Sequence, residues 1–234
     1  MNRDELIERE EGAPKQHDLS DDVHGWYPVD AVSGGTWFGV NNYGLVLALL
    51  NRYQENNPQA HVSRGKIIPQ LLIHKNAQSC LMALDSTSLQ YFMPFTLLLI
   101  QGNRLVRVVW NGSQMSQYVG SFFKPFMITS SSIEIDAVTV WRNQVFNKFL
   151  NTTPSLSARL MMDFHLSSSQ ENVSYSVNMQ REGRHTKSIT QVDVGVERIC
   201  ANYYSRGEAV NGRAQFQSSD CISLKINSSL PCPI

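Results

Sequence analysis

The chain has 234 residues, of which 42% are hydrophobic and 17% are charged, so it can bury a full core and suits one large domain, with two small domains as the alternative. Twenty basic residues balance twenty acidic ones, and no net charge directs the chain to nucleic acid or to an anionic membrane surface. The longest apolar run, Phe92 to Ile100, contains a proline and is far shorter than the roughly 20 residues that span a bilayer. We therefore expect a cytoplasmic protein without a membrane span, which recognises its partners by shape and local chemistry.

The start of the chain is mostly polar. Residues 1–10 predict a short strand followed by a charged loop, and residues 13–33 predict a longer loop that contains proline and aspartate. This loop carries five side chains of metal-ligating type, which are His17, Asp18, Asp21, Asp22 and His24. Because no regular element fixes their spacing, we expect a solvated loop and no metal site.

A β-hairpin is predicted next. Thr36 to Val40 is rich in β-branched and aromatic residues, Asn41 to Gly44 is a turn that easily adopts positive φ, and Leu45 to Leu50 is apolar on both faces. A strand that is apolar on both faces belongs inside a layered structure. We expect Trp37 to anchor the core beneath the hairpin, and Asn51 to end a buried strand, where sites are often built.

The rest of the chain alternates between strand and helix patterns. The clearest helix, Asp136 to Leu150, has a stripe of side chains that we expect to pack on a sheet rather than to line a ligand slot: Val138, Trp141, Arg142, Val145, Phe146 and Phe149. Further helices are predicted at residues 65–75, 77–84 and 156–164. Strands are predicted at residues 95–100, 105–110, 173–179, 188–194, 196–203 and 221–226. Strands, then helices, then strands is the order of a sandwich whose sheets carry helices on the outside.

Four cysteines occur, and no two of them are close in sequence or at a zinc-like spacing: Cys80, Cys200, Cys221 and Cys232. In a reducing compartment we expect free thiols. No glycine-rich phosphate loop is present, so the sequence predicts no cofactor.

Two motifs carry a resemblance to a known family. They are Asn2-Arg3-Asp4-Glu5 and Gly34-Gly35-Thr36-Trp37-Phe38-Gly39-Val40, and weaker likeness continues through Ser63-Arg64-Gly65, residues 128–132 and residues 186–189. The chain resembles the NRDE family, of the transport and Golgi organisation protein 2 type, whose members are similar to N-terminal-nucleophile hydrolases of the bile-salt and penicillin V acylase kind. The resemblance implies an α+β fold, a four-layer αββα sandwich with two mostly antiparallel sheets flanked by helices. It also implies that residues 1–234 form a single NRDE domain.

The resemblance raises a question about the nucleophile. Such an enzyme attacks an amide with a cysteine, serine or threonine at its mature N-terminus, and the α-amine of that residue accepts the proton. The family has a cysteine just after the initiator methionine, whereas this chain has Met1 and then Asn2. We expect the chain to be inactive as written and Met1 to be an internal methionine of a truncated reading frame, lacking an upstream N-terminal strand that begins Met-Cys. The alternative is a genuine short form without catalysis.

The resemblance also assigns supporting site residues. Asn51 matches an asparagine whose amide helps to form the oxyanion hole, a donor that contributes on the order of 3 kcal/mol; otherwise it caps a strand end. Arg3 is implied to orient a substrate carboxylate and Asp4 to bond the α-amine, although a structural salt bridge is an equal alternative. Of Arg184 and His185, only one can face the pocket, because successive strand residues point to opposite faces.

We therefore expect an NRDE-family protein derived from amide hydrolases that act on linear non-peptide C–N bonds, with a small-molecule ligand or substrate that carries an amide or an apolar group. Ser130 stands where the family often has an asparagine, so a second amide donor is not expected. The rival hypothesis is a non-enzymatic carrier of haem or an acyl lipid. The six histidines show no haem attachment motif. The sequence leaves the oligomeric state open.

Overall fold

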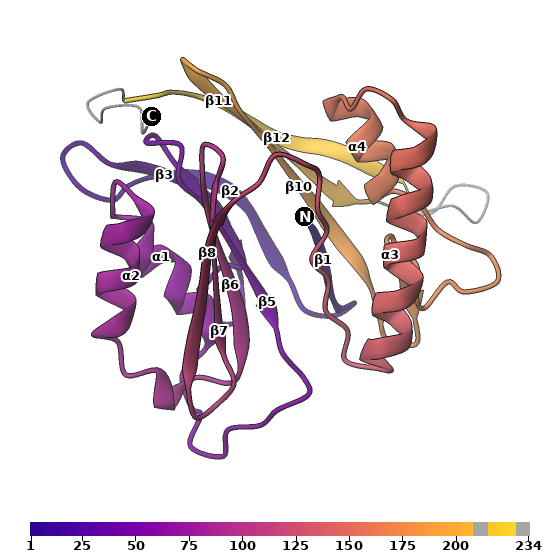
Figure 1. The fold of residues 1–234 in the computed structure, drawn as a ribbon, viewed down its shortest axis with the longest axis horizontal. Coiled ribbons are helices and arrows are strands. Elements are labelled where there is room, and N and C mark those ends of the chain that lie inside the picture. Colours follow the sequence, from indigo (N-terminus) through magenta and orange to yellow (C-terminus); the bar gives the residue numbers. More distant parts are fainter. Residues whose placement is uncertain (208–214, 228–234) are drawn as a thin grey trace. The chain divides into compact units, whose positions relative to one another are not determined.

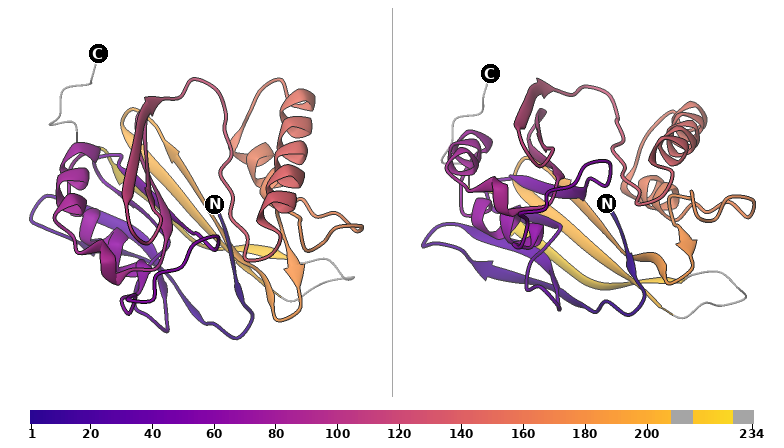
Figure 2. Two further views of the ribbon diagram at one scale, coloured as in Figure 1. Left: turned by 60° about the horizontal axis from the view of Figure 1, so that its bottom comes forward. Right: turned by 90° about the horizontal axis from the view of Figure 1, so that it is seen from below.

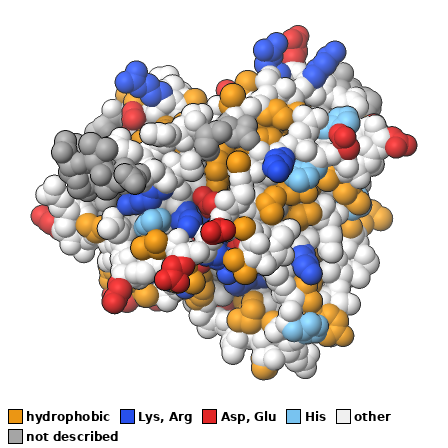
Figure 3. Space-filling view, turned by 180° about the vertical axis from the view of Figure 1, so that it is seen from behind, with side chains coloured by type: hydrophobic (Ala, Val, Ile, Leu, Met, Phe, Trp, Pro, Cys, Tyr) orange, Lys and Arg blue, Asp and Glu red, His pale blue; other side chains and the backbone are white. Residues whose placement is uncertain are grey.

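The computed structural model describes residues 1–207 and 215–227, which form an α+β protein with two antiparallel sheets and helices (Figure 1). The chain divides into two compact units. The first consists of Met1–Glu10, Phe126–Asp193 and Ala201–Ile222, and the second consists of Glu11–Pro125, Val194–Cys200 and the residues from Ser223 onward. Acidic and basic side chains lie interspersed on the face shown in Figure 3, as the equal charge counts predict.

The second unit contains a seven-stranded sheet in which each strand is antiparallel to the next. Its strands follow the order of the chain: β2 (Glu11–Asp18), β3 (His24–Asp30), β4 (Phe38–Asn41), β5 (Val46–Asn51), β6 (Phe95–Gln101), β7 (Arg104–Trp110) and β8 (Met115–Ser121). The predicted hairpin is confirmed, since Phe38 lies opposite Ala48 and Val40 lies opposite Val46. Gly44 closes its turn with a φ of 72°.

The expectation of a loop over residues 13–33 is wrong, because this segment forms most of β2 and β3. β2 is an edge strand in which half of the residues are exposed, so it tolerates the polar sequence that suggested a loop. β3 is the buried neighbour, and its Trp26 is fully enclosed. His17 stacks on Tyr27 at 3.9 Å, and no group of side chains among residues 1–207 and 215–227 has the arrangement of a metal site.

Two short helices cover one face of this sheet, α1 (Ile67–Leu71) and α2 (Ala77–Asp85), with 3-10 turns η1 (Arg64–Lys66) and η2 (Leu89–Tyr91) beside them (Figures 1 and 2). The predicted helix over residues 65–75 is therefore shorter than expected. Leu47 and Leu97 from the sheet pack with Ile68 and Leu84 from the helices in one apolar core. Burial of these side chains supplies most of the stability of the unit.

A close crossing of two backbones explains the glycines of two motifs. A Cβ atom on Gly35 would lie 2.5 Å from the carbonyl carbon of Gly65, which no side chain permits. Thr36 N–H also donates to the Gly65 carbonyl at 2.9 Å. The motifs at residues 34–40 and 63–65 therefore meet because they lock the hairpin to the start of η1.

The first unit contains most of a five-stranded sheet. Its order is β1 (Asn2–Leu6), β10 (Arg184–Val194), β11 (Arg198–Arg206) and β12 (Phe216–Lys225), and β9 (Gln180–Arg181) pairs with β10. The predicted strands at residues 188–194, 196–203 and 221–226 are confirmed with somewhat different bounds. The strand predicted at residues 173–179 is wrong, because Ser176 donates to the Asn172 carbonyl and holds this segment in turns.

Two helices belong to the first unit, α3 (Ile135–Thr152) and α4 (Ala158–His165) (Figure 1). Phe146 of α3 meets Phe164 of α4 edge-on at 5.3 Å, and Val145 and Phe149 pack around this pair. The stripe therefore packs against α4, and its packing on a sheet stays a prediction. Trp141 is half-buried. No helix in the described part of the chain is long and apolar enough to cross a bilayer.

The cysteines described are free thiols, as predicted, and they are Cys80, Cys200 and Cys221. Burial raises the pKa of Cys80 to about 12, so this thiol stays protonated. Cys232 lies outside the described residues.

Candidate functional site

The polar motif at the start of the chain forms β1, and its register with β10 determines what it can contact. Asn2 lies opposite Ile189 and Arg3 opposite Ser188. The register then shifts by one residue on β10, so that Asp4 lies opposite Thr186. Pairing thus unites two of the stretches that suggested the family resemblance, residues 2–5 and residues 186–189.

Asn2 fastens β1 to the end of α4. Its amide Nδ2 donates to the His165 carbonyl at 3.0 Å and to the Val177 carbonyl at 2.8 Å. Its Oδ1 lies 2.6 Å from His165 Nδ1. Since the amide nitrogen already has two acceptors, Oδ1 accepts the proton of Nδ1, which sets the His165 tautomer.

The pKa of His165 is well below its ordinary value. Burial is the main cause, and the positive charge of the chain's amino group adds to it. His165 is therefore a neutral imidazole near pH 7 with Nδ1 protonated, and its Nε2 carries the lone pair.

Asp4 belongs to a network centred on the guanidinium of Arg142, on α3. Asp4 Oδ1 accepts from the Thr186 hydroxyl at 2.6 Å, and Asp4 Oδ2 lies 3.3 Å from Arg142 Nη2. Arg142 also donates to Thr129 Oγ1 at 2.7 Å and to the Tyr175 carbonyl at 3.0 Å. The guanidinium is buried, so its N–H groups would be desolvated and without partners if these hydrogen bonds were absent.

The contacts of Asn2 and Asp4 place Arg3 on the other face of the strand. Both neighbours point towards α3 and α4, and successive strand residues alternate, so Arg3 points away from these helices on the side of Ser188. Arg3 is only 6% exposed. A buried guanidinium on a polar strand face is suited to hold a carboxylate in bidentate fashion.

Glu5 and the two candidates on β10 are also neighbours. Glu5 lies opposite His185, and its Oε1 is 3.5 Å from Arg184 Nη1. Glu5 Oε1 further accepts from Leu6 N–H at 2.9 Å. The structure therefore brings Arg184 and His185 beside the β1 motif, and their part in a reaction stays a prediction.

Asn51 belongs to the second unit, at the end of β5. Its amide donates to the Tyr53 hydroxyl at 3.1 Å, and the residue is half-buried. The assignment of Asn51 as an oxyanion donor stays a prediction. Ser130 uses its backbone carbonyl as a weak acceptor for Arg142, at 3.4 Å.

Sequence reasoning overlooked Arg142 and His165 as site residues. Arg142 appeared only as one member of the packing stripe of α3, although a charged residue between buried Val138 and Phe146 already indicates a buried polar partner. His165 gave no such signal, because it stands at the last position of a short helix. Its partner Asn2 lies 163 residues away in sequence.

The chain is similar to solved structures of a hydrolase and matches the model of one protein family. It is similar in structure to a mutant of conjugated bile acid hydrolase from Clostridium perfringens in which alanine replaces a cysteine, with a TM-score of 0.42 and 8% identity over 100% of this chain and 94% of that one. A variant of the same hydrolase in which leucine replaces an arginine gives a TM-score of 0.43 and 8% identity over 90% and 84%. No curated protein matches the chain. The model of the family Transport and Golgi organisation 2 matches residues 1–207. This chain therefore belongs to the Transport and Golgi organisation 2 family.

Proposed function

We propose that this protein binds a small molecule that carries both an amide and a carboxylate, in a site derived from hydrolases of non-peptide C–N bonds. Arg3 holds the ligand carboxylate. β1 contributes no cysteine, serine or threonine, so no covalent step is assigned to it. The proposed function is recognition of an amide rather than its cleavage by these residues.

The observation that supports this proposal is that neighbouring residues of β1 point to opposite faces of the strand and make different contacts. Asn2 is bonded to His165 and Val177, and Asp4 is bonded to Thr186 and Arg142. Arg3 lies on the opposite strand face, and it is the cation of the motif. A guanidinium pairs with a carboxylate through two parallel hydrogen bonds, which gives orientation as well as affinity.

The support beneath Arg3 has the properties that a binding site needs. A site holds its geometry when neighbouring side chains lock the backbone that carries it. Asn2 and Asp4 flank Arg3 directly, and both are tied to helices of the same unit. We expect the backbone of Arg3 to be more rigid than that of an ordinary edge strand for this reason.

The test is calorimetric titration of the full chain with N-dodecanoylglycine, which has an apolar tail, one amide and one carboxylate. We expect saturable binding that weakens by at least about tenfold in Arg3→Gln, the loss of one charge-assisted pair. Arg9→Gln is the matched control, because Arg9 is a nearby arginine beyond the end of β1, and its ion pair with Glu5 is long, at 3.9 Å. Mass spectrometry of the same mixtures measures release of dodecanoate.

Three outcomes overturn the proposal. Equal affinity of wild type and Arg3→Gln removes Arg3 from recognition. Release of dodecanoate at a rate proportional to protein concentration shows an enzyme rather than a binding protein. Saturable binding of haem or of an acyl-coenzyme A, with no binding of N-dodecanoylglycine, establishes the carrier function instead.

A further inference from the structure

The two edges of the seven-stranded sheet differ in how they are protected. Edge β2 contains Pro14, the charged residues Glu11, Lys15 and Asp18, and a register shift between Gly12 and Lys15. Each of these features discourages another strand from pairing with an edge. Edge β8 reads Met-Ser-Gln-Tyr-Val-Gly-Ser, with no charge, no proline and no register shift over seven residues.

The outer side of β8 presents a regular row of backbone groups. Asn111 N–H donates to Gln114 O at 3.2 Å, and Phe122 N–H donates to Asn103 O at 2.9 Å. These two bonds lie in the register of the β7–β8 ladder, so the even-numbered residues of β8 bond towards β7. The backbone N–H and C=O groups of Met115, Gln117, Val119 and Ser121 therefore point away from the sheet.

Side chains around this edge are exposed and apolar. Tyr118 is 56% exposed and Val119 is 48% exposed, and Phe123, two residues past the strand, is 85% exposed. An uncharged edge flanked by exposed apolar side chains is a template for strand addition. Natural proteins rarely leave such an edge without a partner.

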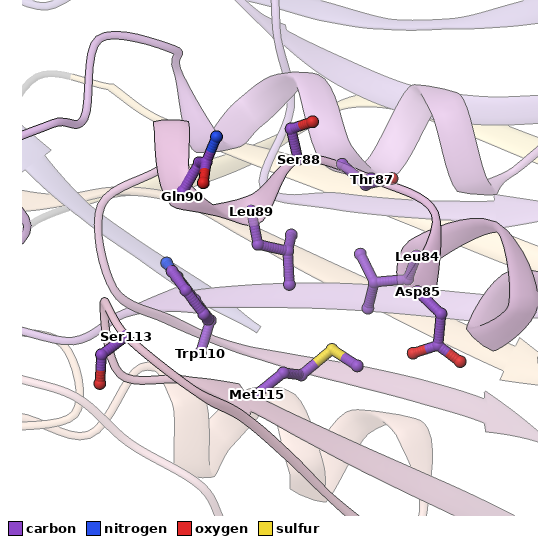
Figure 4. A pocket seen from close by; sticks show the side chains of 9 residues that line it. All are labelled: Leu84, Asp85, Thr87, Ser88, Leu89, Gln90, Trp110, Ser113 and Met115. Carbon is purple, nitrogen blue, oxygen red and sulfur yellow. The ribbon is translucent and has the colours of Figure 1, made fainter.

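A recess of about 350 Å³ opens beside the start of β8 (Figure 4). Leu84 and Leu89 point down into it from α2 and η2, Trp110 and Met115 form its base, and Ser113 lies at its rim. Trp110 uses its indole N–H on the Phe92 carbonyl at 3.0 Å, so it offers the recess an apolar ring. The recess is larger than a phenyl ring, and it combines an apolar base with polar side chains from Asp85, Thr87, Ser88 and Gln90.

We propose that β8 pairs antiparallel with β8 of a second copy of this chain, and that Phe123 of each copy enters the recess of the other. A pairing that uses all seven residues of both strands must place Met115 opposite Ser121 and Gln117 opposite Val119. The outward-pointing backbone groups then bond to one another. The same register places Phe123 opposite Ser113, at the rim of the recess.

The side-chain faces agree with this register. Met115 lies opposite Trp110 and Val119 lies opposite Val106, both of which belong to the core under α1 and α2. Odd-numbered positions of β8 therefore face the side of the sheet on which the recess opens, and Phe123 follows in a bend two residues beyond the end of the strand. Because the interface is symmetric, each copy contributes one aromatic side chain and one recess. The absence of charge on β8 means that two identical strands do not repel one another.

Sedimentation velocity of the full chain, from low to high micromolar concentration, tests the pairing. We expect a concentration-dependent dimer. In Gln117→Pro dimerisation should weaken by at least about tenfold, because proline removes an outward N–H while the bonds to β7 remain. Phe123→Ser should also weaken the dimer, whereas the control Val196→Ser should not, since Val196 is a 94% exposed apolar residue elsewhere in the second unit.

A disulfide trap tests the register. The two-fold axis brings the two Tyr118 residues together as a non-hydrogen-bonded pair, with Cα atoms about 4.5 Å apart, which is within disulfide reach. Tyr118→Cys should therefore form a covalent dimer under mild oxidation. Ser116→Cys, on the same face of the same strand, should not exceed the wild-type background that the native cysteines give.

Each other result overturns the proposal. A monomer at every concentration excludes pairing of β8. A dimer that survives Gln117→Pro uses a different surface, and circular dichroism of that variant verifies that it is folded. A dimer that cross-links through Ser116→Cys but not through Tyr118→Cys has a different register, which removes Phe123 from the recess.

Discussion

Different forces hold β5, the second strand of the predicted hairpin, and β1, which carries the Asn2-Arg3-Asp4-Glu5 motif, in place. β5 is almost entirely apolar, and Leu47 at its centre is fully buried in the core beneath α1 and α2. β1 is polar, and side-chain hydrogen bonds from Asn2 and Asp4 tie it to α4 and α3. Apolar burial depends on volume and is non-directional, whereas a buried polar network depends on each partner being present. The two strands should therefore respond differently to conservative substitutions.

The residues of the β1 motif also differ from one another in the contacts that their side chains make. Asn2 and Asp4 hold the strand, because their side chains form hydrogen bonds with other residues of the first unit. Arg3, between them on the other strand face, is the residue that we propose for recognition. We therefore propose that this motif divides into two anchors and one recognition residue.

The largest effect is expected in β5. Leu47→Ala should lower the free energy of unfolding by about 4 kcal/mol, because it removes a fully buried side chain and leaves a cavity. Leu47→Met should cost less than about 1.5 kcal/mol, since volume is nearly conserved. Urea unfolding followed by circular dichroism measures both. A Leu47→Met variant as unstable as Leu47→Ala would show that shape, not burial, controls this strand.

The next effect concerns the centre of the polar network. Arg142→Met should cost about 3 kcal/mol, because Asp4 and the Tyr175 carbonyl lose their partner while remaining largely buried. Arg142→Lys keeps the charge but not the planar fork, so it should recover only part of that loss. The same urea series applies. If Arg142→Lys had the stability of the wild type, the positive charge alone would account for the network, and the contrast with β5 would be weaker.

A smaller effect is expected for Asn2. Asn2→Leu should cost about 2 kcal/mol, because the carbonyls of His165 and Val177 and the Nδ1 proton are left without the amide. Asn51→Leu is the matched control, since its amide donates to the exposed hydroxyl of Tyr53. Comparable losses in the two variants would contradict an anchoring role for Asn2.

The smallest effect is a dependence on pH. The pKa of His165 is lowered in the folded protein, so folding favours the neutral ring. Its contribution to stability is complete above the unfolded-state pKa of about 6.5 and is lost as the pH falls below that value towards the folded-state pKa. His165→Gln removes this dependence, so the wild type should lose more stability than the variant on acidification.

A control separates this contribution from that of another histidine. Burial, followed by the charge of Lys15, also lowers the pKa of His17. Urea midpoints of His17→Gln at neutral and mildly acidic pH give its share independently. Identical pH profiles for the wild type and His165→Gln would show that His165 does not contribute to the pH dependence of stability.

The sequence predicted those elements whose formation depends mainly on neighbouring residues in the chain. The hairpin of β4 and β5 followed from a turn ending in Gly44 and from apolar residues on both sides, and α3 followed from its periodicity. β2 was missed because an edge strand tolerates loop-like residues, and β3 was missed because its Gly25, Pro28 and Asp30 are typical of a loop. The false strand at residues 173–179 had the right alternation, but hydrogen bonds to Asn172 from Tyr175 and Ser176 compete with a ladder.

The site was predictable only in part. The family resemblance assigned Arg3, Asp4, Arg184 and His185 to one site together with Asn51, and the pairing of β1 with β10 brings the first four together. It did not show which strand face each residue uses, because that depends on the register shift between Arg3 and Asp4. The partners Arg142 and His165 lie far along the chain, and no local pattern links them to β1.

The most direct test of the division of labour along β1 compares Arg3→Gln with Asp4→Asn in two measurements. One is the free energy of unfolding in urea, and the other is affinity for N-dodecanoylglycine by calorimetry. We predict that Asp4→Asn loses more stability than Arg3→Gln, whereas Arg3→Gln loses more affinity than Asp4→Asn. If Arg3→Gln is the more destabilised variant and still binds as tightly as the wild type, Arg3 is an anchor like its neighbours and the account is contradicted.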